Sequence, residues 1–160
     1  MRRQKGFSLI ELLIVVAIIL IIAAIAIPNL LRARIASNES SAVESVRTVN
    51  TAQVSYQSAY SSVGFSPDLN SLAGTSCTPP SSAGACLIDT QLASGTKSGY
   101  SFTMQGVTGT PALTYQVVAS PINPNQSGVR YFCSFQDGVI RVNPTQAIST
   151  CDYTQSPLNQ

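Results

Sequence analysis

The sequence predicts an α+β protein, in which one long N-terminal helix precedes a mostly antiparallel sheet. Three observations support this class: an unbroken apolar run near the start, a helical repeat of apolar residues behind it, and alternating segments separated by turn residues in the second half. A chain of 160 residues suits one folded domain.

The first element is a helix long enough to cross a membrane. Every residue of Leu12–Ile27 is apolar. As an α-helix, Phe7–Ile27 is about 31 Å long, which matches the hydrocarbon core of a bilayer. The basic residues Arg2, Arg3 and Lys5 precede it, which favours a cytoplasmic N-terminus and an outward-facing remainder.

Glu11 does not suit a plain membrane anchor, because a carboxylate within a span is costly. It suits a secretory signal peptide no better, although residues 24–26 (AIA) offer a cleavage pattern that would make Ile27 the new terminus. A third interpretation gives Glu11 a partner. Cleavage between Gly6 and Phe7 creates an α-amino group four residues before Glu11, and the two charges are tolerable in apolar surroundings as a pair. A pair formed between neighbouring molecules would fix the stagger between their helices.

The segment KGFSLIELLIVVAIILIIAAIAIP, residues 5–28, closely resembles the N-terminus of type IV prepilins and of the related type II secretion pseudopilins. The resemblance implies that a prepilin peptidase cuts after Gly6 and that Phe7 is then N-methylated. It also implies that Glu11, the fifth residue of the mature chain, guides filament assembly.

The same resemblance implies the pilin fold and a division of the chain. Residues 1–6 are expected to be the leader peptide, residues 7–28 the transmembrane and filament-core helix, and residues 29–160 the globular head. Leu20 stands where many family members have glycine, and Pro28 is retained. Because proline lacks a backbone donor and clashes with the carbonyl one turn earlier, we expect a helix break or kink there.

The helix is expected to continue into the head, because residues 29–58 contain no Gly or Pro. A stripe of core-type residues recurs at three- and four-residue steps: Ile35, Ala42, Val43, Val46, Val49, Gln53, Tyr56 and Tyr60. The charged residues sit largely off this stripe: Arg32, Arg34, Glu39, Glu44 and Arg47. The whole helix, from Phe7 to about Tyr60, would be about 80 Å long. Its amphipathic half should pack on the sheet, whereas the protruding apolar half needs a membrane or other copies of the chain.

Four strands are expected on the C-terminal half of the helix. They are YSFTMQGV (100–107), LTYQVVA (113–119), RYFCSF (130–135) and VIRVN (139–143). Asp137 and Gly138 mark a hairpin turn between the last two. Before the strands, residues 61–98 are rich in turn residues, with a short helical turn expected at residues 67–72 and Asp68 in its first turn.

Four cysteines lie in the polar part of the chain. They form no CxxC pairs, which disfavours zinc, and an even number in an exported domain favours two disulfides. Three connectivities are possible, and we expect the sequential one. Cys77–Cys86 would then close a turn-rich loop, and Cys133–Cys151 would hold the C-terminal tail.

Composition disfavours catalysis and nucleic-acid binding. The chain has no His, the commonest general base, and only 10% charged residues, against roughly 25% in soluble proteins. We expect no enzymatic activity, no cofactor, no metal and no specific nucleic-acid site. Some pseudopilins carry an acidic C-terminal calcium loop, whereas Asp152 is the only acid in residues 141–160 here.

The resemblance favours a structural subunit of a type IV pilus. Such a precursor sits in the inner membrane with its C-terminal domain outward, is cut by prepilin peptidase, and is polymerised by the inner-membrane assembly machinery. The product is an extracellular homo-oligomeric filament for adhesion, motility or DNA uptake. The alternative is a pseudopilin of a type II secretion system, and a secreted binding domain that does not polymerise is less favoured.

Overall fold

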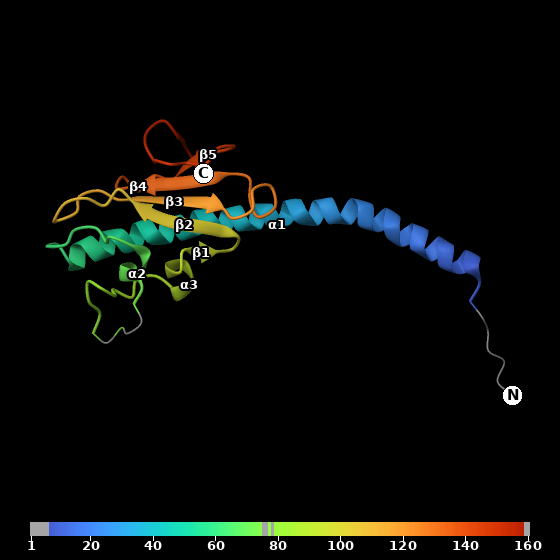
Figure 1. The fold of residues 1–160 in the computed structure, drawn as a ribbon, viewed down its shortest axis with the longest axis horizontal. Coiled ribbons are helices and arrows are strands. Elements are labelled where there is room, and N and C mark those ends of the chain that lie inside the picture. Colours follow the sequence, from blue (N-terminus) through green and yellow to red (C-terminus); the bar gives the residue numbers. More distant parts are fainter. Residues whose placement is uncertain (1–6, 75–76, 78, 159–160) are drawn as a thin grey trace. The chain divides into compact units, whose positions relative to one another are not determined.

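Helix α1 runs from Leu9 to Ala59 (Figure 1). The structure, a computed structural model, describes residues 7–74, 77 and 79–158. Its contacts divide the chain into two compact units, Met1–Arg34 and Ile35–Gln160. Each unit is described by itself.

In the first unit, α1 buries none of its side chains. Every described residue up to Arg34 is exposed, apart from the half-buried Ala23. Pro28 lies inside α1, and the helix is continuous through it, so of the expected break or kink the single chain shows no break, and the kink stays a prediction. Proline removes only one backbone donor, and the good helix formers on either side, Ala and Leu, keep the neighbouring turns intact.

The sheet of the second unit has six strands in the order β1-β2-β3-β4-β5-β6, and each pairs antiparallel with its neighbour. The strands are β1 Thr96–Lys97, β2 Tyr100–Gln105, β3 Gln116–Pro121, β4 Tyr131–Phe135, β5 Arg141–Asn143 and β6 Ser156–Pro157 (Figure 1). The α+β class with an antiparallel sheet is confirmed, but the expected number of four strands is wrong. The extra strands β1 and β6 have two residues each, too few to show an alternating pattern.

Strand β3 begins later than its sequence suggests. Leu113 is 67% exposed, and the residue before it belongs to a connection beside the end of α1. There the Ala112 N–H donates to the Val63 carbonyl and the Ala112 carbonyl accepts from the Phe65 N–H. These bonds use the backbone groups of Ala112 outside the ladder, so pairing with β2 starts at Gln116.

The amphipathic half of α1 packs on the inner face of the sheet. Its buried residues are Glu39, Ala42, Ser45, Val46, Val49, Asn50, Ala52, Gln53 and Tyr56. The apolar members share one core cluster with Val117, Ala119 and Phe132 of the sheet. Of the predicted stripe, Ala42, Val46, Val49, Gln53 and Tyr56 are buried, and Ile35, Val43 and Tyr60 are half-buried. Glu39, Ser45, Asn50 and Ala52 are buried as well, although they lie outside the predicted stripe.

The outer face of the sheet carries a second, smaller cluster. Because side chains alternate along a strand, Val118 and Cys133 point away from α1 and pack with Phe135, Ile148 and Cys151. The C-terminal segment thus covers part of this face. The cysteines are paired sequentially, Cys77 with Cys86 and Cys133 with Cys151.

Two short helices connect α1 to the sheet. In α2 (Leu69–Leu72), Asp68 is the N-cap, and its carboxylate accepts from the Ser71 N–H at 2.7 Å. Helix α3 (Thr90–Ala93) was not expected from the sequence. It is capped in the same way by Asp89. Because Asp is a preferred N-cap residue, Asp89 was the signal in the sequence for the start of this helix.

Candidate functional site: the N-terminal helix

Ser8 and Glu11 together form the start of α1. The Ser8 backbone N–H donates to Glu11 Oε2 at 2.9 Å. Because Leu9 is the first helical residue, Ser8 and Glu11 have the spacing of a capping box, S-x-x-E. The carboxylate also lies in the first turn, where the helix dipole favours a negative charge. This local partner was missed from the sequence, although the S-x-x-E pattern is a readable signal for it.

The expected cleavage site lies directly before this cap. Phe7 precedes the helix and is 78% exposed. Gly6 lies outside the described residues. The structure therefore describes only the residue that follows the expected cleavage site.

The apolar run of α1 is a continuous exposed surface. The large apolar residues from Leu9 to Leu31 are between 42% and 77% exposed. Within the described part of the chain, α1 is the one helix long and apolar enough to span a membrane. An exposed apolar surface of this extent marks a contact with membrane or protein, so its partner must come from outside the chain.

The sequence of this helix is shared with known proteins. A family described as the prokaryotic N-terminal methylation motif matches residues 1–27. The type IV major pilin protein PilA of Myxococcus xanthus is 44% identical over 73 residues, which are 41% of this chain and 33% of that protein. The N-terminal segment of this chain is therefore similar to that of proteins named as type IV pilins.

A second relative is similar over a shorter stretch. The type IV wide pilus major component PilA4 of Thermus thermophilus is 65% identical over 40 residues, 25% of this chain and 30% of that protein. The chain spans about a third of the length of these curated relatives. No solved structure matches the chain.

In the second unit, buried amides on α1 fix the helix against the sheet. Asn50 Nδ2 donates to Ser134 Oγ at 2.9 Å and to the Gly138 carbonyl at 3.1 Å, and Asn50 Oδ1 accepts from the Tyr115 hydroxyl. One turn on, Gln53 forms a pair of hydrogen bonds with the backbone of Ser66. Because a buried amide without partners is costly, a shift of α1 by one turn would be strongly disfavoured.

Glu39 joins α1 to the segment before β4. Its carboxylate accepts from the Val129 N–H at 2.9 Å, the Arg130 N–H at 3.0 Å and Arg130 Nε at 2.7 Å. Burial alone would raise the pKa of Glu39, but these hydrogen bonds and the Arg130 charge outweigh it and hold the pKa below its usual value. The helical repeat places Glu39 off the packed stripe, and the partner that allows its charge to be buried, Arg130, lies far away in sequence.

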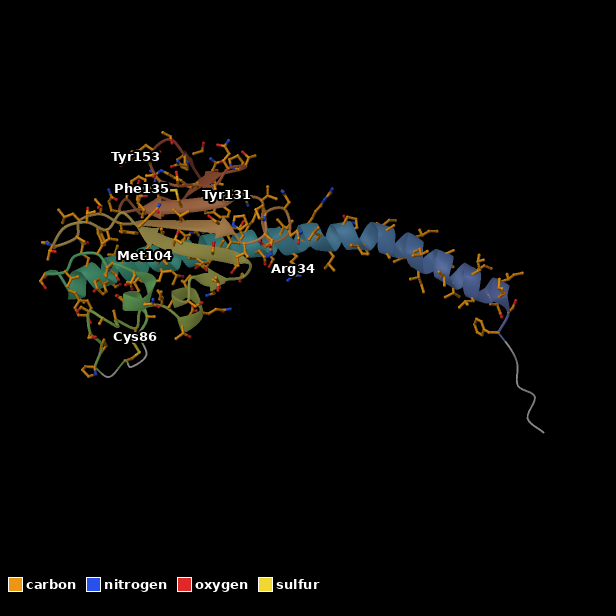
Figure 2. All side chains as sticks on the ribbon, viewed as in Figure 1. Arg34, Cys86, Met104, Tyr131, Phe135 and Tyr153 are labelled. Atoms are coloured by element: carbon orange, nitrogen blue, oxygen red, sulfur yellow. A yellow bond between two sulfur atoms is a disulfide. The ribbon has the colours of Figure 1, made fainter. Side chains whose placement is uncertain are left out.

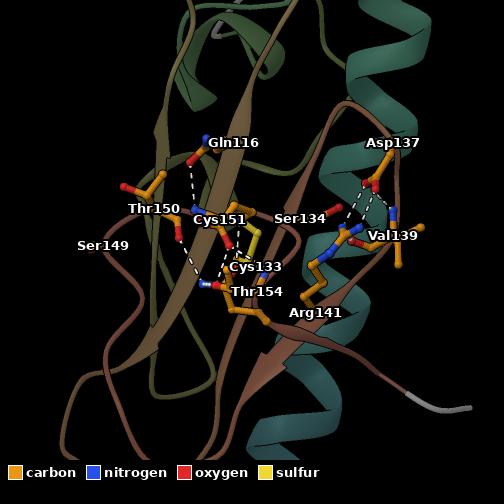
Figure 3. The surroundings of a disulfide bond; sticks show 12 residues. Gln116, Cys133, Ser134, Asp137, Val139, Arg141, Ser149, Thr150, Cys151 and Thr154 are labelled. Atoms are coloured by element: carbon orange, nitrogen blue, oxygen red, sulfur yellow. Dashed lines mark hydrogen bonds and ion pairs between the residues drawn. A yellow bond between two sulfur atoms is a disulfide. The ribbon is translucent and has the colours of Figure 1, made fainter.

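The C-terminal segment of the second unit is held by more than its disulfide (Figure 3). Beside Cys133–Cys151, Gln116 Oε1 accepts from the Cys151 N–H. The Arg141 guanidinium binds the Asp137 carboxylate through two hydrogen bonds, the shorter 2.6 Å, and stacks 4.2 Å from the Phe135 ring centroid. Asp137 thus keeps its expected place at the hairpin turn and gains an ion pair. Among the described residues, no three His, Cys, Asp or Glu side chains gather as metal ligands would.

Proposed function

We propose that the chain is a structural subunit of a type IV pilus, made as an inner-membrane precursor and polymerised into an extracellular filament. The observation that carries the proposal is the exposed apolar half of α1 behind a capped carboxylate. The two relatives are named as pilus components, which favours a pilus over a secretion pseudopilus. The proposal assigns no catalytic step to the chain.

The proposed division follows the N-terminal motif. Residues 1–6 are a leader that prepilin peptidase removes after Gly6, and residues 7–28 are first a membrane span and then the filament core. Residues 29–160 form the head, which faces outward. Removing the leader leaves Phe7 as the N-terminal residue, and its amine is then methylated.

Glu11 is proposed to bind the Phe7 amine of a neighbouring copy during assembly. The cap uses Oε2, and no partner is found for Oε1 in the described part of the chain. Oε1 can therefore accept from an incoming ammonium while the cap is kept. Since both charges are costly alone in an apolar environment, the pair selects one stagger between neighbouring helices.

Mass spectrometry on filaments sheared from cells tests the proposal. We expect a chain that starts at Phe7, carries one added methyl group, and has lost four hydrogens to its two disulfides. Blocking cleavage by Gly6→Leu should leave a precursor starting at Met1 and no filaments. A chain that starts at Ile27 would identify a secreted domain and overturn the proposal.

A further inference from the structure

Two arginines follow the apolar run of α1. Arg32 and Arg34 are both exposed, and Figure 2 labels Arg34 on the helix. In the part of the chain that the structure describes, neither takes part in an ion pair. The four pairs found there use Arg47, Lys97, Arg130 and Arg141. We name Arg32 and Arg34 the arginine collar.

The spacing of the collar places charge on two sides of the helix. Residues two apart in an α-helix are separated by about 200° around the axis and about 3 Å along it. They do not share a face, so an acidic patch on a single neighbour would not reach both. A layer of anions that surrounds the helix at one height would reach both.

The distance along α1 matches such a layer. The proposed span ends at Pro28, and Arg32 and Arg34 follow it by four and six residues, about 6 and 9 Å along the helix axis. Their long side chains can reach back toward the edge of the hydrocarbon core. Headgroup phosphates lie at this depth.

The orientation of the head makes the collar unusual. Lys and Arg favour the cytoplasmic end of a span, yet in the proposed orientation the collar lies at the outer end. The leader supplies three cations, Arg2, Arg3 and Lys5, at the inner end. Cleavage removes all three, and the collar then holds the only Lys or Arg side chains of the mature chain before Arg47. A guanidinium binds phosphate through two parallel hydrogen bonds.

We propose that the arginine collar binds the phosphates of anionic phospholipids in the outer leaflet before the subunit is assembled. The proposal rests on the membrane insertion that is part of the proposed function. Acidic side chains on a second copy of the chain would be a competing partner, which the test below separates from lipid.

The test measures lipid selectivity of the full chain in phosphatidylcholine bilayers, using spin-labelled phosphatidylglycerol and phosphatidylcholine as probes. We expect the wild type to prefer phosphatidylglycerol. Each Arg→Gln change in the collar should lower the preference by about fivefold, the equivalent of about 1 kcal/mol for one cation at an anionic surface. The leader cations are common to wild type and variants, so the difference isolates the collar. It should shrink at high salt.

Arg47→Gln is the matched control, because Arg47 is an exposed cation of α1 that lies in the head. The lipid selectivity of this variant should equal that of the wild type. Arg32→Lys with Arg34→Lys should keep part of the preference. Equal selectivity in the wild type and in the variant with both Arg32→Gln and Arg34→Gln would overturn the proposal. The proposal would also be overturned if this double variant kept the lipid preference of the wild type but showed weaker cross-linking between copies. That result would identify a second chain as the partner. A chain that alkaline carbonate extracts from the bilayer would overturn the proposed function as well, whereas a retained chain without selectivity overturns only the collar.

Discussion

The two halves of α1 have the same backbone and opposite surroundings. From Leu9 to Arg34 the helix buries no side chain, although this half is the more apolar. From Ile35 to Ala59 it buries nine residues, three of which, Glu39, Asn50 and Gln53, carry a charged or amide side chain. Apolar composition alone therefore does not decide what is buried in the single chain.

This difference separates two sources of stability. The second half is held by its own sheet, so its sequence alternates between packed and solvent-facing positions. The first half packs against no other element among the described residues, so its apolar surface is available to the lipid and the neighbouring subunits of the proposed function. A substitution in the first half should therefore leave the stability of the head unchanged. A substitution in the second half should leave membrane insertion unchanged.

The largest expected effect comes from Glu11→Ala. It leaves the Phe7 amine of the neighbouring subunit without its carboxylate, and an unpaired buried charge costs about 3–5 kcal/mol. We expect filament yield to fall by about two orders of magnitude, measured as sheared protein per cell, while the membrane-bound pool persists. Thermal unfolding of the head in detergent micelles should not change.

Glu44→Ala is the control for Glu11→Ala. Glu44 is also an exposed carboxylate of α1, and its ion pair with Arg47 is long, at 3.6 Å, and solvent-accessible, so it contributes little. Its filament yield should stay within a factor of two or so of the wild type. A normal yield for Glu11→Ala would refute the assembly role given to this residue.

The next largest effect concerns the head alone. Replacing Cys133 and Cys151 by Ser opens a loop with a sequence separation of 18, and the chain-entropy relation puts the loss at about 3 kcal/mol. Chemical denaturation of the full chain in micelles would measure it. Membrane insertion should stay as in the wild type, and a loss of insertion would show that the two parts of the chain are not independent.

A matched pair of valines gives a smaller and cleaner contrast. Val46 is completely buried and Val16 is 45% exposed, in the same helix. Val46→Ala should lower the free energy of unfolding of the head by about 1.5–3 kcal/mol, whereas Val16→Ala should leave it unchanged within about 0.5 kcal/mol. Equal losses in a urea titration would mean that the first half also stabilises the head.

Much of this architecture was predictable because it depends on local patterns. The length of α1, the buried stripe around Val46 and Val49, and the turn at Asp137 follow from periodicity and turn chemistry. The hydrogen bond between Glu11 and the Ser8 N–H is equally local, and the S-x-x-E capping pattern predicts it.

The rest depends on contacts that no local pattern encodes. Glu39 can be buried because its carboxylate accepts hydrogen bonds from the Val129 N–H and the Arg130 side chain, about 90 residues away in sequence. Strands β1 and β6 exist only as partners of β2 and β5. The local effect of Pro28 predicts a break or a kink, and the helix is not broken there because the apolar turns on both sides keep their hydrogen bonds.

The smallest expected effect tests whether the charge of Glu39 matters to the second half of α1. Its carboxylate is buried and accepts three hydrogen bonds, two of them from Arg130, whose side chain is partly exposed. Glu39→Gln should therefore destabilise the head by about 1.5–2 kcal/mol at pH 7. Because the pKa of Glu39 is lowered in the folded state, its contribution is fully present above the unfolded value near 4.5 and is lost as the pH falls through the folded pKa. The wild type and Glu39→Gln should thus converge in stability as the pH falls from 4.5 to below the folded pKa of Glu39, whereas Glu44→Gln should match the wild type at pH 7. A constant gap between wild type and Glu39→Gln from pH 7 to pH 3 would show that the shape of the side chain, and not its charge, holds the segment before β4.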